Sequence, residues 1–293
     1  MYHTINETTR SMGAATATVI ADTVSPSTNR RITTLELIYP RIIHSELMTH
    51  RAFARNAASS RATPVRTCLD EVDADPYIPA HWYENKRGMA GGAELTAEES
   101  QSAYRIVYEL RAHALAAVAA LTQLRVSKQQ ANRYLEPWLS IRTLVTATEW
   151  ENFFELRLDE AHVQPEMYDL ACAMRAAMDA SEPARGRRHL PYVDAAFPDD
   201  CGAEDGAVIR AALQSAARCA RVSYLTHDAK QTDEGQDLAL ARRLLADGHM
   251  SPFEHQCTAA TFDLPYANFK GWRSFRFDLE TSATTRKLAG GEA

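Results

Sequence analysis

The sequence predicts an α+β fold, mixed but mostly helical. Residues 33–39 alternate apolar and polar side chains, as in a half-buried strand. Several later segments instead repeat apolar residues every three to four positions, as amphipathic helices do. Hydrophobic residues make up 45% of the 293 residues, against only 12 glycines and 12 prolines. The chain therefore has the volume for a large core and too few breakers for a series of tight hairpins.

The first strand ends at Pro40, and a helix is expected from about Ile42 to Arg51. The residues that follow, 52–63, are mostly Ala, Ser, Asn and Arg, too small-sided to form core, and predict a functional loop or a loose helix. Residues 64–95 contain scattered prolines and a glycine cluster, which indicate a long inserted connection.

The longest element is expected after this connection. Thr96 and Glu99 have the spacing of a capping box and predict a helix of roughly 25 residues. Its expected apolar face includes Leu110 and Val118. Further helices are expected over residues 128–135, 149–158, 165–178, 205–220 and 236–247, the last ending at Gly248, followed by a strand over 257–264 that Pro265 ends.

The organisation predicted along the chain is two halves joined by a linker rich in proline, glycine and arginine. In chain order the expected segments are a disordered leader (1–15), a first half (16–182), the linker (183–206), a second half (207–284) and a frayed tail (285–293). Neither end is expected to take part in chemistry.

Charge and composition exclude several classes of function. A net charge of -6 gives no positive field to hold a nucleic acid polymer. The five cysteines are odd in number and have no Cys-x-x-Cys spacing, and no apolar signal segment opens the chain, so we expect a reduced, cytoplasmic protein. Since no window approaches about 18 uninterrupted apolar residues, no membrane span is expected.

The first segment with chemical character is Thr49-His-Arg-Ala-Phe-Ala-Arg-Asn-Ala-Ala-Ser-Ser-Arg61. It concentrates three arginines, a histidine, an asparagine and two serines beside almost no large apolar residue. These polar groups suit a phosphorylated ligand. A solvated, basic, Ala-rich helix is the alternative interpretation.

The second segment is Gly248-His-Met-Ser-Pro-Phe-Glu-His255. Its two histidines and its carboxylate suggest metal chelation, but Pro252 breaks the helix on which paired histidine ligands usually sit. We expect contact to a cofactor or a structural polar network, and no metal. A dinucleotide fold is also disfavoured, because no Gly-x-Gly-x-x-Gly follows a strand.

Together these segments resemble the signatures of the flavin-dependent thymidylate synthases. The first is similar to the family's Arg-His-Arg-x-x-Ser-x-Asn-Glu-x-Ser-x-Arg at five of its eight fixed positions, and the second is similar to the family's His-x-x-Pro-Phe-Glu-His block. Three shorter stretches also resemble family blocks, and the likeness covers about 150 residues: Ala131-Asn-Arg-Tyr-Leu-Glu-Pro137, Asn152-Phe-Phe-Glu-Leu-Arg157 continuing to His162, and Ala220-Arg-Val-Ser-Tyr224.

The sequence also departs from the family pattern. Thr49 stands where the family has its first Arg, Ala54 where it has Ser, Ala57 where it has Glu, and Glu46 where a Gln is usual. In the family the His-x-x-Pro-Phe-Glu-His block precedes the Arg-His-Arg motif, whereas here it follows about 200 residues later, the order of a circular permutation.

A strand-Pro-helix spacing occurs twice, which is what permutation through duplication would leave behind. Pro40 precedes Arg51 by eleven residues, as Pro265 precedes Arg276. Chance similarity of two strand-helix units is the alternative.

The resemblance implies C5-methylation of a uridylate nucleotide. It implies FAD as the source of the hydride, methylenetetrahydrofolate as carbon donor, NADPH as reductant, and a homotetramer with sites shared between subunits. By matching position, Arg157 is the catalytic residue expected to act on the pyrimidine. The nucleotide contacts implied are Glu46, Thr49, Asn56, Ala57, Ser59, Ser60, Arg61 and Arg133, and the flavin contacts implied are His50, Arg51, Asn152, His162, Ser223, His249, Ser251 and Glu254.

Ala57 is the departure from the family pattern that concerns recognition of the sugar of the nucleotide. A glutamate there would contact the nucleotide, so its replacement by alanine leaves room for a 2′-hydroxyl, and UMP becomes a substrate candidate alongside dUMP. Family members that act on UMP in nucleoside-antibiotic pathways provide an analogy. Two rival interpretations stay open: a non-catalytic homologue that binds flavin or nucleotide, and a helical interaction protein without a ligand.

Overall fold

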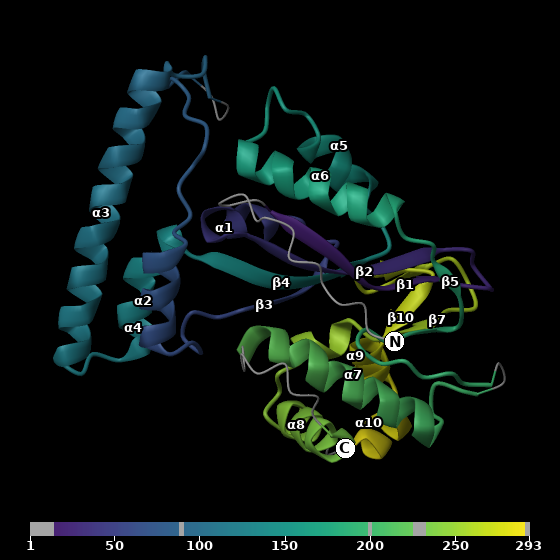
Figure 1. The fold of residues 1–293 in the computed structure, drawn as a ribbon. Coiled ribbons are helices and arrows are strands. Elements are labelled where there is room, and N and C mark those ends of the chain that lie inside the picture. Colours follow the sequence, from purple (N-terminus) through teal and green to yellow (C-terminus); the bar gives the residue numbers. More distant parts are fainter. Residues whose placement is uncertain (1–14, 88–90, 199–200, 225–232, 291–293) are drawn as a thin grey trace.

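A five-stranded sheet separates two layers of helices in the computed structural model (Figure 1). The structure describes residues 15–87, 91–198, 201–224 and 233–290, without the side chains of residues 223 and 224. The strands lie in the order β3-β4-β2-β1-β5, all neighbours antiparallel except the short β5, which runs parallel to β1. Their bounds are Thr16–Val24 (β1), Arg31–Pro40 (β2), Ala54–Ala57 (β3), Ser140–Ala147 (β4) and Ala184–Arg185 (β5). The α+β class predicted from the sequence is confirmed.

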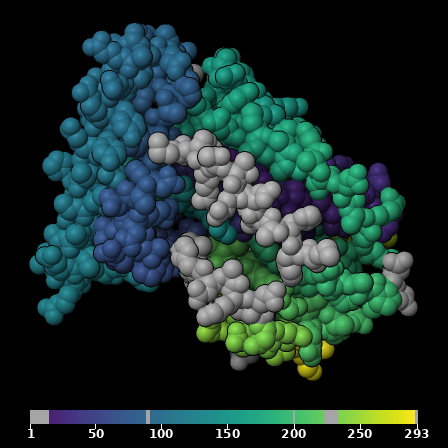
Figure 2. Space-filling model, in the orientation of Figure 1, coloured from purple at the N-terminus to yellow at the C-terminus, as the bar shows by residue number. Residues whose placement is uncertain are grey.

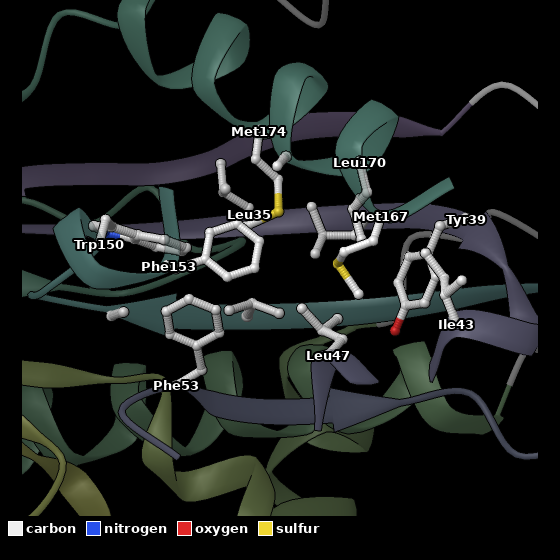
Figure 3. Close-up of a cluster of buried hydrophobic side chains, with 14 of the residues drawn as sticks. Leu35, Tyr39, Ile43, Leu47, Phe53, Trp150, Phe153, Met167, Leu170 and Met174 are labelled. Carbon is white, nitrogen blue, oxygen red and sulfur yellow. The ribbon is translucent and has the colours of Figure 1, made fainter. Parts of the chain in front are cut away.

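One face of the sheet packs against the helices α5 (Glu151–Arg157) and α6 (Pro165–Asp179). The alternation of β2 turns Leu35 and Leu37 toward this layer, where α6 buries Met167, Leu170 and Met174 over them (Figure 3). The predicted strand and the predicted helix are therefore both confirmed, with the expected faces inward.

The other face is covered by α7 (Gly206–Tyr224), which packs on β3 and β4. Beyond it lie α8 (Glu234–Ala246), the 3-10 turn η3 (Ser251–Glu254), α9 (Phe275–Thr281) and α10 (Ala283–Ala289). A small sheet, β10-β7-β6 (Trp272–Ser274, Cys257–Ala259, Arg188–His189), and a hairpin of β8 (Pro265–Tyr266) and β9 (Phe269–Lys270) complete this layer. Both predicted helices of this half are present, and Gly248 ends α8 with a φ of 74°.

A helical arm stands beside the sheet and forms one side of the molecule (Figures 1 and 2). It comprises α2 (Val65–Ala74), α3 (Ala97–Gln123), α4 (Lys128–Ala131) and the 3-10 helix η2 (Asn132–Trp138). The capping box of Thr96 and Glu99 opens α3 as predicted. Val118 is buried as expected, but Leu110 is 56% exposed, because the arm covers only a narrow stripe of α3.

Several boundaries differ from the prediction. After the 3-10 turn η1 (Arg41–Ile43), the helix α1 (His44–Leu47) ends well before residue 51. Residues 52–63 do not form a loose helix, and part of the segment belongs to the core. Strand β3 runs through it, and the small residues of β3 pack between β4 and the opposite layer. Strand β4 was not predicted, since it is buried on both faces and shows no alternation.

The second half also departs from expectation. The strand expected over 257–264 stops at Ala259, and Pro265 opens the β8–β9 hairpin instead of leading into a helix. Arg276 lies in the first turn of α9, whereas Arg51 follows α1 in a turn. The two strand-Pro-helix spacings therefore do not correspond to equivalent structures.

The expected linker and tail contain regular structure. The linker pairs with both sheets through β5 and β6, and α10 occupies residues 283–289 of the region where a frayed tail was expected. The expected leader lies almost entirely outside the described residues. Among the described residues, no helix combines the length and apolar character needed to cross a membrane.

Candidate functional site

The two sequence motifs meet at the edge strand β3. Because side chains alternate along a strand, Asn56 points toward α7 while its neighbours Arg55 and Ala57 point to the opposite face. The Asn56 amide nitrogen donates to the Cys219 carbonyl over 2.7 Å, and the Ser251 hydroxyl donates to Asn56 Oδ1 at 3.5 Å. Segments 195 residues apart in sequence are therefore neighbours in one chain.

His50 and Arg157 form the second contact between predicted site residues. Arg157 Nε donates to His50 Nε2 over 3.1 Å, so the neutral ring must accept at Nε2 and hold its proton at Nδ1. The His50 ring also stacks with Phe53 and meets Phe153 edge-on at 4.8 Å between centroids. Burial lowers the pKa of His50, and the positive charges of Arg157 and Arg55 lower it further.

A cluster of charged residues surrounds the predicted phosphate end of the site. Glu136 accepts from the Ser60 hydroxyl at 2.6 Å and from Arg133 at 2.9 Å, and it pairs with Arg41 at 3.1 Å. Arg61 is exposed and lies 3.5 Å from the Ser59 hydroxyl. Within the part of the chain that the structure describes, the backbone N–H groups of residues 59 and 60 have no protein acceptor.

The second motif is divided between surface and core. His249 and Ser251 are exposed, whereas Glu254 is largely buried and accepts from Arg276 over 2.6 Å. Burial raises the pKa of Glu254, and the Arg276 guanidinium opposes that rise. His255 is fully buried and hydrogen-bonds through Nδ1 to Thr146 at 2.8 Å.

Several other predicted site residues take no part in these contacts. Thr49 is exposed and donates to the Glu46 carbonyl at 2.7 Å, which closes the end of α1. His162 is exposed and hydrogen-bonds only to Asp159 among the described residues. Arg51 and Asn152 are exposed, Ala57 is half-buried against the apolar core, and the side chain of Ser223 lies outside the described residues.

The structure adds residues that the motifs did not single out. These are Arg41 and Glu136 at the predicted phosphate end, Arg276 on Glu254, and Arg55, which donates to the carbonyls of Met48 and His50. Glu136 follows Arg133 by three residues, a spacing that favours a helical ion pair and was a usable signal. Arg41, Arg55 and Arg276 reach their partners only through the tertiary fold.

A buried polar network ties the five-stranded sheet to the layer that contains α7. His189 bonds Thr23 at 3.0 Å and Thr34 at 2.7 Å, Thr34 bonds Thr146 at 2.6 Å, and Thr146 bonds His255. Both histidines are completely buried, and desolvation lowers the pKa of each to about 3. They are therefore neutral in the folded protein at ordinary pH.

Acid should destabilise the protein through this pair. The unfolded state binds protons below a pKa of about 6.5 while His189 and His255 stay neutral until the pH approaches 3, so stability falls as the pH drops below about 6.5. The expected slope is on the order of 1 kcal/mol per pH unit for each histidine. Urea unfolding at pH 7.5, 6 and 5 measures it. His189→Gln should give a shallower slope, and His113→Gln, on the exposed side of α3, should not; equal slopes in all three proteins would refute this account.

The volume of the cavity limits how much of a cofactor a single chain can enclose. A cavity of 250 Å³ opens between β3, η3, the hairpin and α9, lined by Ala54, Glu254, Ala267, Asn268, Phe269, Ser274, Arg276, Phe277 and Glu280. Sites for small organic ligands usually measure about 300–1,000 Å³, so this cavity holds no more than part of a dinucleotide-sized cofactor. The carboxylate, guanidinium and amide groups of its lining, from Glu254, Arg276 and Asn268, suit the polar part of such a ligand. Among the described residues, no three His, Cys, Asp or Glu side chains gather as metal ligands.

Comparison with known proteins gives limited matches. No protein-family model and no curated protein matches the sequence. Two solved structures similar to part of this chain are of a UMP/dUMP methylase, PolB, from Streptomyces cacaoi. The one bound with 5-Br UMP is 17% identical and covers 57% of this chain and 89% of its own, with a TM-score of 0.48. The one bound with 5-Br dUMP is 19% identical and covers 50% of this chain and 66% of its own, just under two thirds, with a TM-score of 0.41.

Proposed function

We propose that the protein methylates C5 of a uridylate nucleotide, dUMP or UMP, as a variant of the flavin-dependent thymidylate synthases with a permuted order of motifs. The contact between Asn56 and Ser251 supports this most directly. These residues belong to motifs that are adjacent blocks in the family and about 200 residues apart here. A fold that joins them again is expected if permutation preserved one site.

In the proposed reaction, methylenetetrahydrofolate supplies the carbon and NADPH supplies two electrons. The nucleotide loses its C5 proton, the transferred methylene gains a hydride to become methyl, and tetrahydrofolate and NADP⁺ are released. FAD, when bound, would supply the chemistry of hydride transfer between NADPH and the methylene group. A non-catalytic flavin- or nucleotide-binding protein is the rival interpretation.

Arg157 is proposed to stabilise the negative charge that develops on the pyrimidine. Its Nε is occupied by His50, but among the described residues its two Nη groups have no partner, so they remain available to a ligand. Arg61, Arg133 and the open N–H groups of residues 59 and 60 are proposed to bind the phosphate, since planar guanidinium and backbone donors both suit it.

The proposed flavin contacts are His50, His249, Ser251 and Asn152, whose imidazole, hydroxyl and amide groups suit the heteroatoms of an isoalloxazine. Because a single chain offers an open surface and a cavity of only 250 Å³, we propose a homotetramer whose subunits enclose the cofactor together. Light scattering tests the assembly. A species of one chain mass, 32.6 kDa, that binds FAD with full occupancy would rule it out.

Release of tritium from C5-labelled dUMP or UMP is the decisive assay, in the presence of FAD, methylenetetrahydrofolate and NADPH. Release that depends on both co-substrates supports the proposal. A preparation that holds flavin but releases no tritium favours the non-catalytic rival. A colourless protein that binds neither flavin nor nucleotide would exclude both.

The sugar preference should depend on position 57. Ala57 lies on β3 opposite Thr143, whose hydroxyl bonds the Tyr39 hydroxyl at 2.9 Å, so a glutamate there would place a carboxylate beside this pair. We expect wild type to turn over UMP measurably and Ala57→Glu to shift preference toward dUMP. An unfavourable polar contact costs about 1–3 kcal/mol, roughly a 5- to 150-fold change in the ratio of kcat/KM values.

Ala57→Gln is the matched control for this change, because it adds the same bulk without the charge. A shift in both variants assigns the effect to size, and a shift in Ala57→Glu alone assigns it to charge. If wild type accepts dUMP only, or if the ratio is the same in Ala57→Glu, the 2′-hydroxyl is recognised elsewhere.

A further inference from the structure

Arg55 occupies an unmarked position of the first motif, between Ala54 and Asn56, yet it makes the most specific contacts to the turn after α1. Its Nη1 donates to the Met48 carbonyl over 2.6 Å and lies 3.3 Å from the His50 carbonyl. These carbonyls lie beyond the end of α1, where helical hydrogen bonding no longer supplies donors. Arg55 therefore closes the turn from which the His50 side chain projects.

The orientation of His50 in turn fixes Arg157. The imidazole is confined by Phe53 and Phe153, and it accepts from Arg157 Nε at 3.1 Å. A planar guanidinium that is bound through Nε on one side can rotate little, so its Nη groups point in one direction. A displaced His50 ring would release this constraint.

Glu254 of the second motif acts on Arg55 through its charge alone, because no hydrogen bond or ion pair joins the two side chains among the described residues. Burial lowers the pKa of Arg55 and raises the pKa of Glu254, and the attraction between the two opposite charges opposes both shifts. Glu254 is itself fixed by Arg276 at 2.6 Å.

We propose that Arg55 is a positioning residue: by binding the 48–50 turn it holds the His50 ring where Nε2 accepts from Arg157. Arg55 itself does not touch the nucleotide. The consequence for turnover rests on the proposed function, whereas the consequence for the His50 ring does not. The charged groups that face His50 are Arg157 from α5 and Arg55 from β3.

The state of the His50 ring gives a test that is independent of activity. The full-length protein with ¹⁵N-labelled histidine is compared with Arg55→Met, Arg55→Lys and Arg66→Met, and His50→Gln identifies the ring signals. In wild type the His50 nitrogens should show the Nδ1–H form. Arg55→Met should move them toward the average of the two neutral forms, Arg55→Lys should restore most of the wild-type position, and Arg66→Met, on the exposed side of α2, should have no effect.

Kinetics supply the second measurement. If the protein methylates uridylate, Arg55→Met should lower kcat about tenfold or more with little change in the KM for nucleotide, because misplacing a catalytic group by a fraction of an ångström is costly. Arg55→Lys should recover most of the loss. Thermal unfolding of each variant checks that it is folded.

The proposal is overturned, whatever the activity, if the His50 signals are unchanged in a folded Arg55→Met. If Arg55→Met does not fold, Arg55→Gln is used for the same measurement. Changed signals with an unchanged kcat would overturn the role of Arg55 in turnover. If wild type has no methylation activity, the proposed function fails, while the ring signals still decide whether Arg55 positions His50.

Discussion

Arg157→Ala is expected to abolish methyl transfer while the protein still binds flavin. The side chain is half-buried at the end of α5, and its Nε donates to His50. Its two Nη groups have no partner among the described residues and are therefore available to a ligand. Removing one preorganised donor that stabilises developing charge typically lowers kcat by about 10²–10³. The measurement is tritium release from the C5-labelled nucleotide, with flavin absorbance per chain recorded on the same samples.

Arg105→Ala provides the matched control, because Arg105 lies on the exposed side of α3 and bonds only Ser102 among the described residues. It should leave kcat and flavin content unchanged. Near-normal turnover in Arg157→Ala would remove Arg157 from the mechanism. Loss of flavin from that variant, with nucleotide binding retained, would assign Arg157 to the cofactor instead.

The largest expected effect on stability is that of Asp237→Ala. Asp237 is fully buried in α8 and accepts from Arg218 at 3.0 Å and from Arg221, two cations of α7. Removing one partner of a buried ion pair leaves uncompensated charge, at a cost of about 3–5 kcal/mol. Since both arginines keep some exposure to solvent, we expect about 3 kcal/mol, the lower end of that range.

Chemical denaturation measures this change, and Asp247→Ala is its control. Asp247 follows α8 at an exposed position, and its replacement should alter the free energy of unfolding by no more than about 0.5 kcal/mol. A loss in Asp237→Ala as small as in the control would show that the two arginines find solvent or other partners without cost. Asp237→Asn, which keeps the shape of the side chain, should lie between the two.

Local rules explain the elements that the sequence predicted well. Over residues 33–39 of β2 the apolar side chains of Leu35, Leu37 and Tyr39 share one face, and α6 buries one face of its helix, so both show a regular period in the sequence. The capping box at Thr96 and the positive φ of Gly248 depend on residues within one turn of a helix end. For the same reason β4 was missed, because a strand covered on both faces has no alternation to detect.

Periodicity, caps and short polar patterns are local properties, so the α+β class, most helices and the identity of the two motifs could be predicted from the amino-acid sequence alone. In contrast, the packing of distant segments makes Ala54–Ala57 an edge strand that contacts the second motif, and it pairs Arg157 with His50. It also brought Arg41 and Arg276 to Glu136 and Glu254, and Arg55 to its turn. Except for Arg55 and its nearby turn, these partners lie about 20 to 200 residues apart, and such pairings depend on how strands and helices pack, which no local pattern encodes.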